Sequence, residues 1–141
     1  MAIDIEKYLT VPYVDGGRTM AGGDCWFLTC AVREEMGLPA LPSLGGTTRH
    51  TPLAMAHEYE RVSSGLVVCE PCEGAIAAVF RGRLMIHVGA VVMIDGRLAV
   101  LETNPASGPR WMWTHDFIQR YFKVIFYRDH QSVSEQADPR S

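Results

Sequence analysis

The fold is organised around the stretch Gly22-Gly23-Asp24-Cys25-Trp26-Phe27-Leu28, in which two glycines lead into a cysteine. From Cys25 to Met36 the apolar residues recur at mostly helical spacings, and Gly37 then supplies a stop signal, so we expect a helix over residues 25–36. The N-terminus of a helix carries a partial positive charge and unpaired N–H groups, which favour a thiolate over a thiol. Cys25 is therefore a candidate nucleophile, with plain packing in the core as the alternative. Cys30 lies about 140° around the same helix, and we expect it only to pack.

The composition is that of one globular domain. Of the 141 residues, 48% are hydrophobic and 21% are charged, which is enough for a single core. We expect this domain over residues 1–128 and a disordered tail over residues 129–141. A net charge of −3, with scattered Lys and Arg, argues against nucleic acid as a partner. No apolar run reaches the roughly 18 residues of a membrane span, and the N-terminus lacks the pattern of a signal peptide.

The apolar pattern changes along the chain from helical to strand-like spacing. Helices come first and an antiparallel sheet follows, with Asp95-Gly96 as the strongest hairpin signal, so the expected fold class is α+β. We expect Thr114 to cap the last helix. The expected helices cover residues 3–9, 25–36, 51–61 and 115–122, and the expected strands cover residues 66–68, 75–80, 86–94, 97–103 and 123–127.

A catalytic cysteine needs a base, and one of the five histidines is suitable. Only His87 begins an apolar strand, where a polar residue requires an explanation, and Gly89 leaves room beside it on the same face. A histidine that merely bonds to a backbone carbonyl is the alternative. If Asp95-Gly96 is a two-residue turn, the hairpin register sets Gly89 opposite Glu102 and His87 opposite Asn104. Either of these two side chains can then orient the imidazole.

Several short segments of the chain keep a distinctive order and spacing. They are Pro12-Tyr13-Val14-Asp15-Gly16-Gly17, Asp24-Cys25-Trp26, Gly37-Leu38-Pro39, His87-Val88-Gly89, Val100-Leu101-Glu102-Thr103-Asn104-Pro105, Gly108-Pro109-Arg110-Trp111 and Phe126-Tyr127-Arg128. In this combination the chain resembles the NlpC-type family of papain-like cysteine peptidases, in particular its short members in phage tail-tip proteins. The resemblance implies a papain-like core, with N-terminal helices packed on a small antiparallel β-sheet.

The resemblance also implies roles for individual residues. Cys25 corresponds to the nucleophile and His87 to the general base. Tyr13 corresponds to a residue near the thiol, and Asp24 and Trp26 flank the nucleophile. These last three residues are therefore expected in the substrate and oxyanion region.

Two positions depart from the family pattern. Phe27 stands where a small glycine usually follows the Asp-Cys-aromatic start, and Glu102 stands where the third catalytic residue is usually a histidine. A carboxylate can also orient an imidazole and stabilise its cation. We therefore expect Glu102 to be the third catalytic residue, with Asn104 as the alternative orienting residue.

The function that the resemblance implies is hydrolysis of amide bonds in peptidoglycan stem peptides by two-step acyl transfer. No cofactor is expected, and no metal, because the single Cys69-Glu70-Pro71-Cys72 motif has no matching second pair. The expected partners are the wall peptide and other phage tail proteins, for a chain made in the bacterial cytoplasm and carried in the virion tail. Two alternatives remain: a tail-tip structural or assembly protein without turnover, and a transacylase or amidase using the same Cys-His pair.

Overall fold

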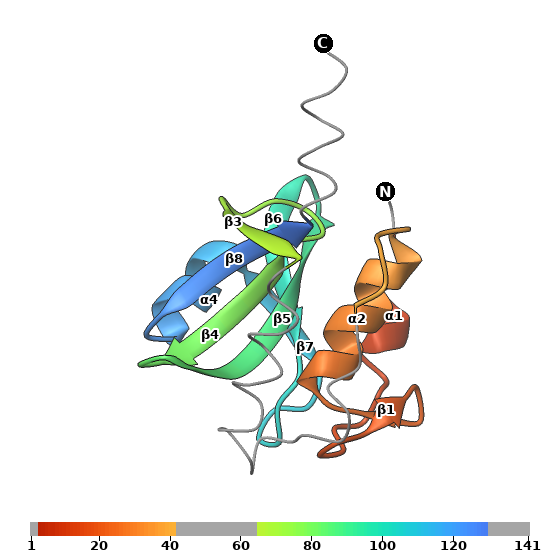
Figure 1. Ribbon diagram of the computed structural model, residues 1–141. Helices are drawn as coiled ribbons and strands as arrows, with labels where there is room; N and C mark the ends of the chain where they lie inside the picture. The colour runs from red at the N-terminus through yellow and green to blue at the C-terminus, as the bar shows by residue number, and fades with distance from the viewer. Residues whose placement is uncertain (1–2, 42–64, 130–141) are drawn as a thin grey trace.

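The fold is an α+β arrangement built on one large antiparallel sheet, as expected from the sequence (Figure 1). A computed structural model of the chain describes residues 3–41 and 65–129, so the expected helix over residues 51–61 lies outside the described residues. The elements are α1 (Ile5–Tyr8), β1 (Arg18–Thr19), β2 (Gly22–Gly23), α2 (Cys25–Glu35), β3 (Leu66–Cys69), β4 (Ile76–Arg81), β5 (Leu84–Ile94), β6 (Arg97–Glu102), β7 (Arg110–Trp113), α4 (Thr114–Arg120) and β8 (Val124–Asp129). The larger sheet has the strand order β3-β8-β4-β5-β6-β7, and β1 pairs with β2 separately.

The hairpin of β5 and β6 has the register that the sequence predicts. Its ladder runs from Ile94 opposite Arg97 to Ala90 opposite Leu101. The two turn residues, Asp95-Gly96, have φ angles of +50° and +77°, the positive values that a type I′ turn requires. The register therefore brings the beginning of β5 alongside the end of β6.

A β-bulge interrupts the pairing of β4 with β5 next to His87. Val79 pairs with His87, whereas the following residue, Phe80, pairs with Met85. Ile86 is thus the extra residue on β5. Because a bulge bends its strand and changes the direction of the side chains beside it, this irregularity helps to aim the imidazole.

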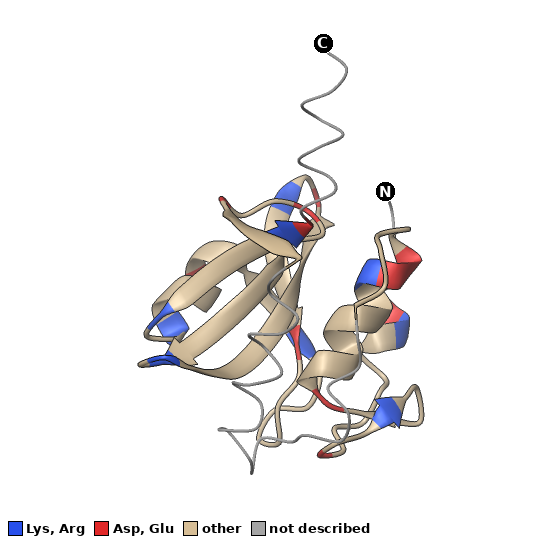
Figure 2. Cartoon of the chain, in the orientation of Figure 1, with Lys and Arg blue, Asp and Glu red and all other residues tan. Residues whose placement is uncertain are grey.

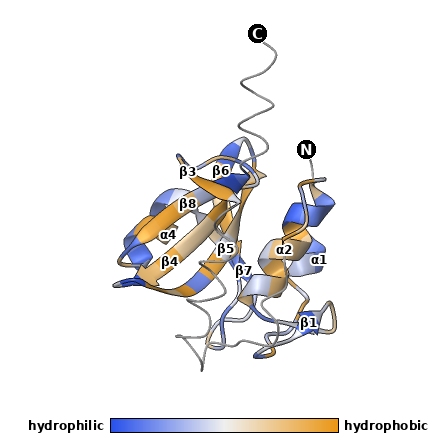
Figure 3. Cartoon of the chain, in the orientation of Figure 1, coloured by the Kyte–Doolittle hydropathy of each residue, from blue (hydrophilic) through white to orange (hydrophobic). Residues whose placement is uncertain are grey.

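Helices cover both faces of the sheet, with α1 and α2 on one side and α4 on the other (Figure 1). The strands between them are largely apolar (Figure 3), as expected when both faces are covered. On the first face, Ala90 and Val92 belong to a buried cluster with Leu28 of α2. On the second face, Val91 belongs to a buried cluster with Phe117 of α4. In the described part of the chain, no helix has the length and apolar character needed to cross a membrane.

Helix α2 has well-formed caps at both ends. At its start the Asp24 carboxylate accepts a hydrogen bond of 2.9 Å from the N–H of Phe27, and its other oxygen pairs with Arg18. At its end Gly37 has a φ of +83°, and the N–H groups of Gly37 and its successor return to carbonyl oxygens of the last turn. This is a Schellman motif, which requires a residue that tolerates positive φ. The caps define where the helix begins, and hence where Cys25 lies.

A buried ion pair ties α2 to the last strand of the chain. Nη2 of Arg33 donates to the two carboxylate oxygens of Asp129 at 2.7 and 2.6 Å. The side chains are 1% and 9% exposed. Asp129 thus belongs to β8, so its inclusion in the expected disordered tail over residues 129–141 was wrong. The remaining tail residues lie outside the described ranges.

The start of α4 differs from the expectation. The helix begins at Thr114, and Trp113, with an extended backbone of φ −61° and ψ 147°, is its N-cap. The prediction of Thr114 as the cap was therefore wrong, and its Oγ1 is buried without a hydrogen-bond partner in the described structure. The physical reason is that β7 extends through Trp113, so the end of the strand sets the start of the helix.

Replacing Asp129 by Ala is expected to destabilise the fold by about 3–5 kcal/mol, because the Arg33 guanidinium is left buried without its counter-ion. The measurement is the free energy of unfolding in urea. The matched control is the double variant Arg33→Met/Asp129→Leu, which removes both charges and should recover much of the loss. Equal stability of Asp129→Ala and the wild type would show that the pair does not stabilise the packing of α2 on β8.

Candidate active site

Three side chains from three separate elements meet in one buried group. Cys25 is the first residue of α2, His87 lies beside the bulge of β5, and Glu102 is the last residue of β6. Nε2 of His87 lies 2.6 Å from Oε1 of Glu102, and a side-chain hydrogen bond joins His87 to Cys25. Because Glu102 occupies Nε2, Nδ1 is the ring nitrogen left for the sulfur. The order is therefore thiol, imidazole, carboxylate, as in a catalytic triad.

The glycine beside His87 lets the two strands place these groups together. A Cβ added at Gly89 would lie 2.6 Å from Cγ1 of Val100 and 3.4 Å from Cβ of Glu102. Distances as short as the first do not occur in folded proteins, so side chains of β6 occupy the space that Gly89 leaves. From there Glu102 reaches diagonally along the hairpin to the imidazole, within the range of diagonal cross-strand neighbours.

The site carries a buried ion pair. The relative exposure is 2% for His87 and 0% for Glu102. Burial of the ring lowers the pKa of His87, but hydrogen bonds with Cys25 and Glu102 outweigh it and raise the pKa to about 9. Burial raises the pKa of Glu102, but hydrogen bonds from His87 and Tyr121 outweigh it and lower the pKa to about 2. At neutral pH the imidazole is therefore cationic and the carboxylate anionic.

Two further residues hold Glu102, and the sequence pattern had assigned neither of them to the site. Nε of Arg110 donates to Oε2 at 2.8 Å, and the hydroxyl of Tyr121 donates to Oε1 at 2.7 Å. Arg110 stands directly opposite Glu102 in the pairing of β6 with β7. This cross-strand pair is the sequence signal that could have identified Arg110. Recognising it requires the register of β6 against β7, and the segment that connects these strands has no two-residue turn signature from which to read the register.

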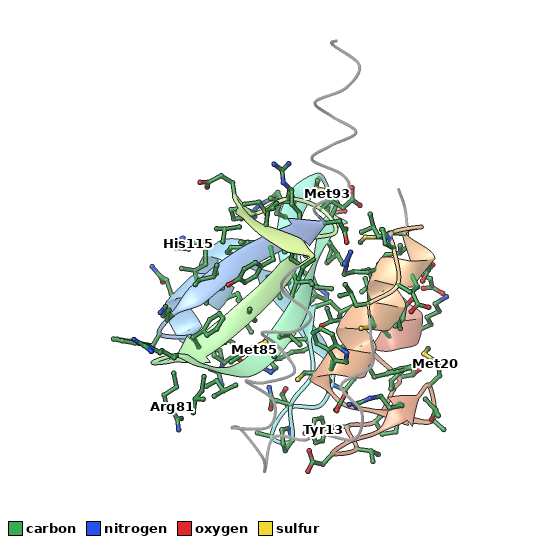
Figure 4. All side chains as sticks on the ribbon, in the orientation of Figure 1. Tyr13, Met20, Arg81, Met85, Met93 and His115 are labelled. Carbon is green, nitrogen blue, oxygen red and sulfur yellow. The ribbon has the colours of Figure 1, made fainter. Side chains whose placement is uncertain are left out.

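The residues expected around the nucleophile lie close to it along the chain. Tyr13 forms an isolated backbone bridge with Gly23, and its hydroxyl donates to Asp15 at 3.2 Å. Figure 4 shows Tyr13 near the start of α2. Asp24 caps α2, as described above. Trp26 is 3% exposed and packs in the apolar cluster that also contains Cys25.

A pocket of about 360 Å³ borders the His87 ring. Asn104 contributes to its wall, but Oδ1 of this residue accepts hydrogen bonds from the N–H groups of Ala106 and Ser107, both at 2.9 Å. Of the two candidate orienting residues, Glu102 is therefore the one that bonds to the imidazole, whereas the Asn104 oxygen accepts hydrogen bonds within the turn that follows it. The residues lining the pocket are Ile86, His87, Asn104, Pro105, Ala106, Arg120 and Tyr121.

The other histidine and cysteines in the described residues stand apart from this group. His115 is exposed on α4 (Figure 4). Burial raises the pKa of Cys30 to about 12, and its side chain packs against the apolar cluster around Trp26. Burial and the adjoining Cys72 raise the pKa of Cys69 to about 11. Within residues 3–41 and 65–129, no group of three or more His, Cys, Asp or Glu side chains is arranged to hold a metal ion.

Comparison with known proteins gives no independent assignment: the chain matches no family model and no curated protein. Most charged residues lie at strand ends, in turns and on α1 (Figure 2). Glu102 and Arg110 also lie at strand ends, but Glu102 is buried, and folded proteins rarely bury ionised groups unless they are paired. The functional conclusion therefore depends on the geometry of this buried group.

The ion pair predicts how stability varies with pH. Since the pKa of His87 is raised from 6.5 to about 9, its contribution is complete below about pH 6.5 and is lost as the pH rises through about 9. Since the pKa of Glu102 is lowered from 4.5 to about 2, its contribution is present above about pH 4.5 and is lost as the pH falls through about 2. The loss of stability caused by Glu102→Gln should therefore be larger at about pH 5.5 than at about pH 10. Urea unfolding at both pH values measures this, and an equal loss at both would contradict the ion pair.

Proposed function

We propose that this chain is a cysteine peptidase in which Cys25 is the nucleophile, His87 the general base and acid, and Glu102 the orienting carboxylate. The observation that carries the proposal is the position of the His87 ring, which is hydrogen-bonded to the Cys25 side chain at one nitrogen and to Glu102 at the other. A nucleophile, a base and a third group holding the base form the arrangement that covalent acyl transfer requires.

The proposed reaction has two steps. The sulfur of Cys25 attacks the scissile carbonyl carbon, and backbone N–H groups at the start of α2 stabilise the negative charge that develops on the oxygen. The C–N bond breaks as His87 donates its proton to the leaving amine, which leaves a thioester. Water then attacks the thioester as His87 takes its proton, the C–S bond breaks to release the acid, and this proton restores the starting state that Cys25 and His87 share. Glu102 holds the ring in place and stabilises its cation in both steps.

The proposed substrate is a peptidoglycan stem peptide, cut by a papain-like core in a phage tail-associated wall hydrolase. The sequence resemblance is the ground for this substrate and setting. The architecture is in keeping with such a core, because α2 carries the nucleophile and packs on an antiparallel sheet that carries the base. The pocket beside His87 offers space for the part of the substrate that bears the leaving amine.

One observation favours a second function, a structural or assembly role without turnover. Cys25 is only 2% exposed, as is common for a cysteine that simply packs. A transacylase or amidase would use the same Cys25 and His87 pair and differ only in the acceptor or the amide. Identification of the reaction products and measurement of the reactivity of the Cys25 thiol distinguish these functions.

Purified peptidoglycan should release new peptide ends in the presence of the wild-type chain and none with Cys25→Ala. Glu102→Gln should lower turnover at least about tenfold, since the imidazole loses its anionic partner, and Asn104→Ala should lower it less. Mass spectrometry of the products gives both the rate and the bond cleaved. Undiminished release by Cys25→Ala would reject the proposed nucleophile, and a larger loss in Asn104→Ala would assign the orienting role to Asn104.

Iodoacetamide at about pH 6 should alkylate Cys25 in the native chain much faster than Cys30, because His87 lies beside the Cys25 sulfur as a base, whereas the pKa of Cys30 is raised to about 12. Peptide mapping by mass spectrometry follows both residues in the same sample, so Cys30 is an internal control. The variant His87→Ala should remove the difference. Equal, slow modification of the two thiols in the wild type would favour the structural role.

A further inference from the structure

We propose that Arg110 and Tyr121 are positioning residues of this site, which together hold the Glu102 carboxylate in the orientation that His87 requires. We call these two residues the Glu102 clamp. The inference rests on the proposed function for its catalytic meaning, but the contacts that define the clamp can be tested without any substrate.

The geometry of the clamp leaves the carboxylate one orientation. His87 and Tyr121 both bond to Oε1, at 2.6 and 2.7 Å, while Arg110 bonds to Oε2 at 2.8 Å. Because both oxygens have partners that approach from different directions, rotation of the carboxylate out of its present plane would break these contacts. The three partners come from β5, β7 and the residue after α4, so the carboxylate is held from three directions.

The chemistry of the clamp follows from the burial of Glu102. A carboxylate with 0% exposure is stable as an anion only when opposite charge and hydrogen bonds replace its water. His87 alone does not ensure this, because its proton can pass to the carboxylate and leave two neutral groups. Arg110 keeps its charge at every working pH. It therefore favours the state in which Glu102 is anionic and the proton stays on the imidazole, where the reaction needs it.

Tyr121 acts on the imidazole as well as on the carboxylate. Its ring centroid lies 5.3 Å from that of His87, and the Phe117 centroid lies 6.4 Å from the same imidazole. The Tyr121 phenol therefore packs against the His87 ring and also donates a hydrogen bond to Glu102, the carboxylate that His87 contacts. Its hydroxyl also has side-chain hydrogen bonds with Arg110 and with Arg120, so the charged and titratable groups around Glu102 are His87, Arg110, Tyr121 and, through Tyr121, Arg120.

The test follows the imidazole signals of His87 by NMR in the full-length chain labelled with ¹⁵N. In the wild type these signals should show no step between about pH 7 and about pH 4, because Glu102 stays ionised over that range. In Arg110→Met a step should occur within it, since a buried carboxylate without its fixed cation takes up a proton at higher pH. Arg110→Lys, which keeps the charge, should restore the flat profile. Flat profiles in both Arg110→Met and Tyr121→Phe would overturn the proposal.

The matched control is Arg97→Met, at the other end of the same hairpin. The Arg97 guanidinium lies over the Trp113 ring, 4.0 Å from its centroid, so the substitution removes one positive charge at an exposed position away from the site. Arg97→Met should leave the His87 NMR signals without a step between about pH 7 and about pH 4. A step in this variant would show that loss of any nearby positive charge produces the effect, and it would overturn the proposal. If Arg110→Met does not fold, Tyr121→Phe carries the test, because it removes only the hydroxyl and should move Glu102 protonation in the same direction.

Turnover separates this proposal from the proposed function. In Arg110→Met, kcat should fall at least about tenfold while KM stays within about twofold, because positioning of the base acts on the chemical step. Arg110→Lys should recover part of kcat. Peptidoglycan cleavage that survives Cys25→Ala would reject the proposed nucleophile without changing the NMR result. Normal kcat together with a flat NMR profile in Arg110→Met would reject the clamp and leave the peptidase intact.

Discussion

The site depends on one buried contact, the hydrogen bond of 2.6 Å between His87 and Glu102. Removing two charged groups from water costs several kcal/mol for each, and their attraction offsets this only when geometry and additional hydrogen bonds are favourable. Both conditions are met here, since each oxygen of the Glu102 carboxylate has a partner and the imidazole has Cys25 at its other nitrogen. The result is a pKa of about 9 for His87 and of about 2 for Glu102. The pair is therefore ionised at neutral pH despite its burial.

The fold places these groups with three local devices. A tight turn at Asp95-Gly96 sets the hairpin register, a bulge at Ile86 redirects the strand beside His87, and the missing side chain at Gly89 leaves space for the side chains of β6. Helix α2 brings Cys25 to the imidazole independently, because its caps define its first residue and its packing holds it on the sheet.

A carboxylate as the third residue changes what the rest of the fold must supply. A neutral amide or imidazole can be buried beside a histidine without a counter-ion, whereas a buried carboxylate needs positive charge and donors on both oxygens. In this chain β7 supplies Arg110, and the residue after α4 supplies Tyr121. These C-terminal elements are thus part of the electrostatic design of the site as well as a cover for the second face of the sheet.

The sequence by itself determined the parts of this protein that depend on neighbouring residues. The helix after Asp24, its end at Gly37 and the hairpin at Asp95-Gly96 follow from capping and turn chemistry, and the turn also placed Glu102 near His87. Tertiary structure alone decided the bulge at Ile86, the ion pair of Asp129 and the start of α4 at the end of β7, where strand pairing overrode the capping preference of Thr114. It alone decided the Glu102 clamp too. Its residues reach one carboxylate from separate elements, and contacts of that kind depend on packing that no local pattern of residues specifies.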